Sequence, residues 1–164
     1  MPRNIAVPDS LPIVLVFAAT DPSGGAGIQA DILTLSSMGC HPLSVITAVT
    51  IQDTMGVEDV LPIDAEWVAD QARCVLEDMP VAVFKVGLLG SVEAIAAIAE
   101  VVSDYPDIPL VLDPVLASGR GDDCQWARRA RGGTRCTGIH LANAQVRVSD
   151  RNGAVDPGPA VLGT

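Results

Sequence analysis

The stretch "LPIVLVFAATDPSGGAGIQAD", residues 11–31, decides the fold. Its unbroken apolar run over residues 12–19 is typical of a strand buried on both faces of a parallel sheet. A helix-like pattern begins at Gly27, so a glycine-rich turn connects the strand to the helix. Such turns commonly hold a phosphate. Here, however, Asp21 and Asp31 flank the turn, which raises the question of whether the bound group is a phosphate or something neutral.

Strand-like and helix-like segments alternate along the rest of residues 12–116. Helical spacing and glycine or serine boundaries predict helices over 27–38, 65–79 and 91–103, and β-branched runs predict strands over 43–52, 56–63, 81–89 and 108–116. Asp64 and Ser91 are the expected N-caps, and Trp67, Val68 and Ala72 are expected to face inward. This order predicts an α/β fold with a mostly parallel sheet covered by helices.

Ligands in such a sheet bind beyond the carboxyl ends of the strands. We expect those ends to present the segments Thr20–Gly27, Gln52–Thr54, Gly87–Gly90 and Asp113–Gly121. Lys85 stands alone among apolar neighbours, so it is expected either to pair with Asp113 or to lie at a strand edge.

Composition excludes several classes of function. The 164 residues carry a net charge of −10 and few aromatic side chains, which argues against binding nucleic acid or an anionic membrane surface. No stretch approaches the roughly 20 apolar residues of a membrane helix. The four cysteines and two histidines form no metal-ligand pattern, so no metal site is expected, and scattered free cysteines indicate a cytoplasmic protein.

The charge is divided unevenly along the chain. Residues 1–123 contain 18 acidic and 4 basic side chains, whereas residues 124–164 contain 2 acidic and 6 basic ones. The second segment has no sustained periodicity, and only "GIHLANAQVRV" within it suggests one short strand. We therefore expect two parts: a folded part over 1–123 and an irregular or poorly ordered tail over 124–164.

The glycine turn has two further interpretations. Gly25-x-Gly27-x-x-Ala30 fits a dinucleotide fingerprint, and Asp53 would then be the acid that binds a ribose. Two observations count against this interpretation. The segment "TDPS" separates the strand from the glycines, and the carboxylates of Asp21 and Asp31 would face the pyrophosphate, which is also negatively charged. Alternatively, the glycines serve only the backbone of a tight turn.

Three segments in order, "ATDPSGGAGIQADILTLSSMGCHPLSVITAVTIQDTMGV", "VFKVGLLGS" and "VLDPVLASGRGD", resemble the hydroxymethylpyrimidine/phosphomethylpyrimidine kinases of thiamine biosynthesis. The resemblance covers about residues 11–123. It implies a ribokinase-like three-layer α/β/α fold, here truncated, and ATP- and Mg²⁺-dependent phosphorylation of a small hydroxymethyl pyrimidine and its monophosphate.

The resemblance also implies that the glycine turn borders the pyrimidine rather than the ATP phosphates. It places Gln52 against the aminopyrimidine, where a carboxamide offers one acceptor and two donors. The other positions that it assigns to this pocket are Ala19, Gly25, Ala26, Asp31, Leu88 and Val115. Ala19 departs from a commoner glycine.

The resemblance stops near residues 122–124, before the family's ATP-binding and catalytic segments. No catalytic residue is therefore predicted, and the abrupt break favours a frameshift in the coding sequence. The alternatives are a non-catalytic pyrimidine-binding remnant and a pyridoxal kinase of the same superfamily. A half-sheet would leave an edge strand uncovered, which would promote instability or association, for example into a homodimer.

Overall fold

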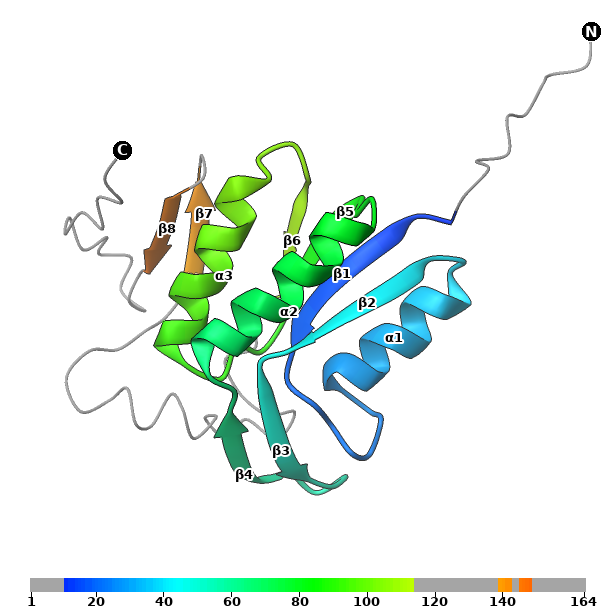
Figure 1. Ribbon diagram of the computed structural model, residues 1–164. Helices are drawn as coiled ribbons and strands as arrows, with labels where there is room; N and C mark the ends of the chain where they lie inside the picture. Colours follow the sequence, from blue (N-terminus) through cyan, green and yellow to red (C-terminus); the bar gives the residue numbers. More distant parts are fainter. Residues whose placement is uncertain (1–10, 114–138, 143–144, 149–164) are drawn as a thin grey trace, which may run out of the picture.

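The computed structural model describes residues 11–113, 139–142 and 145–148. At its centre lies a four-stranded parallel sheet with the strand order β2-β1-β5-β6 (Figure 1). The strands are β1 (Ile13–Ala18), β2 (His41–Ile46), β5 (Val83–Val86) and β6 (Leu110–Leu112). The predicted α/β architecture with a mostly parallel sheet is thus confirmed.

Helices cover both faces of this sheet. On β1, Val14, Val16 and Ala18 face helix α1 (Gly27–Ser37), whereas Leu15 and Phe17 face α2 (Ala65–Asp78) and α3 (Val92–Asp104). Both sets are buried, which explains why the sequence of β1 is apolar without alternation. Phe17 and Phe84 lie 6.2 Å apart between ring centroids in the core beneath α2 and α3.

The segment predicted as one strand over 43–52 is two strands. β2 ends at Ile46, Thr47 breaks the ladder, and β3 (Ala48–Gln52) leaves the sheet to pair antiparallel with β4 (Val57–Pro62). Figure 1 shows this hairpin extending beyond one end of the main sheet. The prediction of one strand over 43–52 is therefore wrong, because an unbroken β-branched run does not reveal where a strand changes its partner.

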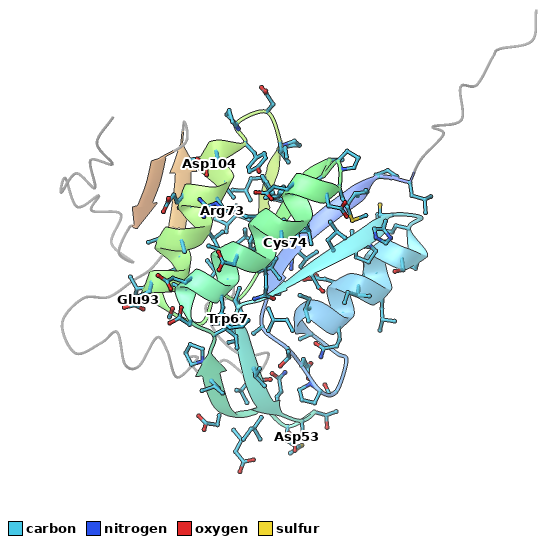
Figure 2. The ribbon with its side chains drawn as sticks, in the orientation of Figure 1. Asp53, Trp67, Arg73, Cys74, Glu93 and Asp104 are labelled. Carbon is cyan, nitrogen blue, oxygen red and sulfur yellow. The ribbon has the colours of Figure 1, made fainter. Side chains whose placement is uncertain are left out.

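The helix boundaries follow the predicted capping residues. The Asp64 carboxylate accepts a hydrogen bond from the Glu66 N–H, and the Ser91 hydroxyl accepts one from the Ala94 N–H. Trp67 does not face inward as expected; it is 70% exposed (Figure 2). Trp67 lies about 100° around the helix from Val68, the first buried residue of α2.

In the C-terminal segment, β7 (Ile139–Ala142) pairs antiparallel with β8 (Gln145–Val148). The sequence suggested one short strand here, whereas two form. Residues 114–138, and with them Val115, lie outside the described residues. Within the described residues, no helix is both long and apolar enough to cross a membrane.

Candidate functional site

The glycine turn is organised by the carboxylate of Asp21, a side chain that is only 1% exposed. Its Oδ1 accepts hydrogen bonds from the N–H and the hydroxyl of Ser23, at 2.9 and 2.8 Å. Its Oδ2 accepts one from the Ala26 N–H at 2.8 Å. Two backbone donors of the turn, the N–H groups of Ser23 and Ala26, are therefore already bound to an anion of the protein itself. This arrangement disfavours a phosphate at the turn.

Gly27 fixes the approach of the turn to the first strand. Its φ of +59° lies in the left-handed region, and a Cβ there would stand 2.5 Å from the carbonyl oxygen of Ala19. That same carbonyl accepts a hydrogen bond from the Ile28 N–H at 2.8 Å. Ala19 is buried at this junction, while Gly25 and Ala26 lie exposed at the outer side of the turn.

Two threonines join the turn to the hairpin. The Thr50 N–H donates to the Thr20 hydroxyl at 3.0 Å, and the Thr50 hydroxyl donates to the Thr20 carbonyl at 2.7 Å. The Thr50 hydroxyl is also 3.5 Å from Oε1 of Gln52. These contacts place the end of β3, and with it Gln52, beside the glycine turn.

Gln52 is half-buried and retains hydrogen-bonding capacity. Among the described residues, its Nε2 has no hydrogen-bond partner, and its Oε1 has only the long contact to Thr50. An amide at this position can donate to one group and accept from another. The carboxamide is thus available to a ligand that presents both an acceptor and a donor.

Asp53 has a structural role. Its carboxylate accepts hydrogen bonds from the N–H groups of Met55 and Gly56, at 2.7 and 3.1 Å, and so closes the turn between β3 and β4. Its side chain is exposed at the tip of the hairpin (Figure 2). The dinucleotide interpretation required Asp53 to be a ribose-binding acid, and this geometry removes that support.

Lys85 lies on the central strand β5, so the expectation of a strand-edge position is wrong and the expected pairing with Asp113 is confirmed. Its Nζ is 3.3 Å from Oδ2 of Asp113 and 2.8 Å from Oδ2 of Asp31. Asp31, predicted to border the pyrimidine, therefore already holds a partner through one carboxylate oxygen. No local feature of the sequence predicts this second pairing.

Leu88 follows β5 at the same end of the sheet. Its side chain is half-buried, and its carbonyl accepts a hydrogen bond from the buried hydroxyl of Thr47 at 2.5 Å. Gly90 has a φ of +74°, and a Cβ there would lie 3.0 Å from that of Ala48. The segment Gly87–Gly90 thus packs against the start of the hairpin.

The structure brings most of the predicted positions to one end of the sheet. Ala19, Gly25, Ala26 and Leu88 lie on the segments that follow β1 and β5, Gln52 ends β3, and Asp31 lies on α1. What sequence reasoning missed is the polar network of Asp21, Thr20 and Thr50 that holds these segments. One signal was present: an aspartate two residues before a serine in a glycine-rich turn is typical of a side chain that caps backbone N–H groups.

The described residues do not fit a metal or a nucleotide phosphate. No group of three or more His, Cys, Asp or Glu side chains among them could hold a metal ion. The N–H groups of Ser23 and Ala26 in the glycine turn are bound by Asp21, and Asp113 faces Lys85. No chemical step is therefore assigned to ATP or Mg²⁺ at these residues.

Comparison with known proteins connects this geometry to a family. The family model for phosphomethylpyrimidine kinase matches residues 21–130. The hydroxymethylpyrimidine/phosphomethylpyrimidine kinase of Streptomyces coelicolor is 43% identical over 115 residues, which are 70% of this chain and 42% of that protein. The chain thus spans less than half the length of this curated relative.

Solved structures agree with the sequence comparison. The phosphomethylpyrimidine kinase of Clostridium difficile superposes with a TM-score of 0.62 at 40% identity, covering 70% of this chain and 49% of that one. A pyridoxal kinase of Staphylococcus aureus, solved with AMP-PCP, gives a TM-score of 0.59 at 31% identity, covering 68% of this chain and 41% of that one. The ribokinase-like fold and the sequence match lead to one conclusion: the chain belongs to the phosphomethylpyrimidine kinase family.

Proposed function

We propose that residues 11–113 form the substrate-binding part of a kinase that phosphorylates 4-amino-5-hydroxymethyl-2-methylpyrimidine and its monophosphate with ATP. The observation that carries the proposal is the glycine turn, whose backbone donors are bound by the Asp21 carboxylate. Because a carboxylate of the protein occupies these donors, the turn suits a neutral ring better than a phosphate. The free carboxamide of Gln52 stands beside it.

The proposed pyrimidine site consists of the predicted positions at this end of the sheet. Gln52 would pair with the ring nitrogen and the amino group, since its amide can accept from one and donate to the other. The oxygen Oδ1 of Asp31, which has no hydrogen-bond partner among the described residues, could accept from a further donor. Ala19, Gly25, Ala26, Leu88 and Val115 would supply the surrounding surface.

The proposal assigns the nucleotide to other parts of such a kinase. The related pyridoxal kinase was solved with AMP-PCP, which supports nucleotide use within the fold. The residues described here do not fit a metal ion or the phosphates of ATP, and the matched relatives are more than twice as long as the aligned segment. We propose that the groups for phosphoryl transfer lie in the part of those relatives that this segment does not match.

Two other functions remain open within the same geometry. The pyridoxal kinase of Staphylococcus aureus shares the fold at 31% identity, lower than the 40% of the phosphomethylpyrimidine kinase, so the pyrimidine is favoured. A non-catalytic pyrimidine-binding module would use the same residues without the transfer step.

We also propose a cytoplasmic location and a homodimer. The free thiols of Cys40 and Cys74 suit the reducing cytoplasm. Val49, Ile51 and Leu61 are exposed on the hairpin. A second copy could cover this apolar surface, so we propose a homodimer.

Calorimetric titration of the chain with hydroxymethylpyrimidine and, separately, with pyridoxal tests the proposed substrate. We expect binding of the pyrimidine and weaker binding of pyridoxal. Tighter binding of pyridoxal would favour the alternative kinase, and binding of neither compound would contradict the proposed site.

A further inference from the structure

Lys85 is a cation held inside the layer between the sheet and α1. Its side chain is 20% exposed, although β5 is an interior strand of the sheet. A Cβ built on Gly87 would lie 3.2 Å from Nζ, so the ammonium lies over the carboxyl end of its own strand. The charge therefore stands at the end of the sheet where the proposed site lies.

The ammonium connects two other elements. Asp31 belongs to α1, the helix that begins directly at the glycine turn, and Asp113 is the first residue after β6. The Asp113 N–H also donates to the Val86 carbonyl at 2.8 Å. Lys85 thus links the helix that carries the glycine turn to the end of β6.

Stability alone does not explain a cation at this position. Lys85 and Asp31 are 20% and 22% exposed, so both charges of this pair lose part of their solvation, and such a pair stabilises a fold little more than apolar side chains of similar volume. Such a pair can instead specify one arrangement of the elements that it joins. The arrangement specified here is that of two strand-end segments around the proposed pyrimidine site.

We propose that Lys85 is a positioning residue: through Asp31 and Asp113 it fixes the glycine turn relative to the end of β6. The part of this inference that concerns the ligand rests on the proposed function, while the part that concerns the turn does not. Lys85 holds the Oδ2 oxygen of Asp31 and so restricts rotation of the Asp31 carboxylate. The other oxygen, Oδ1, therefore keeps one orientation.

The chain contains a matched control. Arg73 on α2 also lies between two carboxylates of α3, 3.1 Å from Asp104 and 3.6 Å from Glu100. Figure 2 labels Arg73 and Asp104. Arg73 joins two elements as Lys85 does, but these helices cover the face of the sheet opposite α1. Loss of Arg73 should therefore leave the glycine turn unchanged.

The test compares Lys85→Met with Arg73→Met in the full chain, by amide hydrogen exchange and by calorimetry with hydroxymethylpyrimidine. In the free protein, Lys85→Met should speed exchange of the turn amides of Ser23 and Ala26 by about fivefold, the effect of about 1 kcal/mol of local stability. Arg73→Met should not change these amides. Lys85→Met should weaken pyrimidine binding by a similar factor, and Lys85→Arg should recover most of both effects.

Each result decides a separate point. Turn amides that exchange equally in the two Met variants would overturn the proposal, and so would exchange that rises uniformly over the sheet. If Lys85→Met does not fold, Asp31→Asn removes the same pair and must show the same faster exchange. If the unaltered chain does not bind the pyrimidine, the proposed function fails while the exchange measurement still decides the role of Lys85.

Discussion

At the scale of single residues, Asp21 answers the question raised by the glycine turn. Its buried carboxylate accepts from backbone N–H groups that a phosphate would otherwise require. The function of such a glycine-rich turn is therefore ambiguous from sequence. The same residues can bind either a phosphate of a ligand or a carboxylate of the protein itself. The acid at the start of the turn distinguishes the two, provided that its carboxylate faces inward.

Replacement of Asp21 by Ala should expose this internal anion site. We expect a loss of unfolding free energy of about 2–4 kcal/mol, because two backbone N–H groups and the Ser23 hydroxyl lose their charged acceptor. Sulfate at matched ionic strength should recover part of the loss, since the freed N–H groups can bind an anion. Urea unfolding with sulfate and with chloride measures both effects.

Asp53→Ala is the control, because Asp53 also accepts from two backbone N–H groups but is exposed. Its loss should cost less than that of Asp21 and show no specific recovery by sulfate. Equal recovery in both variants would contradict the assignment of an internal anion site to Asp21.

Gln52→Ala should weaken hydroxymethylpyrimidine binding by about 1–3 kcal/mol, because the buried polar groups of the ligand would lose their partner. Gln71→Ala is a suitable control: the Gln71 amide bonds to the backbone of Ile46 and Trp67, so it should affect stability rather than binding. Calorimetry on both variants checks this. Unchanged affinity in Gln52→Ala would remove that residue from the site.

At the scale of elements, most strands and helices could be predicted because each has a local cause. Capping by Asp64 and Ser91 fixed two helix starts, and the apolar run of β1 indicated a strand buried on both faces. The division at Thr47 has no such local cause: it depends on hydrogen bonds of Thr47 with Ala18 and Leu88. Among the predicted site residues, Asp31 illustrates the same limit, since its partner Lys85 is 54 residues away.

The junction of β1 and α1 requires a glycine at residue 27. Gly27→Ala should cost more than about 2 kcal/mol of unfolding free energy, since it adds a clash with the Ala19 carbonyl to the roughly 1–2 kcal/mol of left-handed strain. Gly39 has a φ of +77° and open space around an added Cβ, so Gly39→Ala should show the left-handed backbone strain without a clash. Equal losses in urea unfolding would mean that the junction relaxes freely.

At the scale of the whole molecule, the described residues belong to a chain that spans less than half the length of its kinase relative. These residues form the proposed pyrimidine site, and none of them belongs to a group of side chains that could hold a metal ion. The matched segment covers 42% of the Streptomyces coelicolor relative. Catalysis of phosphoryl transfer depends on positioning and on donors around the moving group. Under the proposed function, these residues recognise the substrate.

We therefore expect the chain, incubated with ATP, Mg²⁺ and hydroxymethylpyrimidine, to form little phosphate ester. Loss of one donor around the moving phosphoryl group commonly costs about 10²–10³ in rate, and loss of a general base a further 10²–10⁴ or so. The full-length kinase of Streptomyces coelicolor serves as the positive control. Turnover within about tenfold of that enzyme would show that the chain carries the transfer groups as well.

The central claim is that the glycine turn serves a neutral pyrimidine and not a phosphate, and amide chemical shifts measured by NMR test it most directly. Addition of hydroxymethylpyrimidine should move the backbone signals of Gly25 and Ala26 and the side-chain amide of Gln52. Addition of Mg·ADP should leave these signals in place. Shifts of Gly25 and Ala26 caused by the nucleotide but not by the pyrimidine would contradict the account.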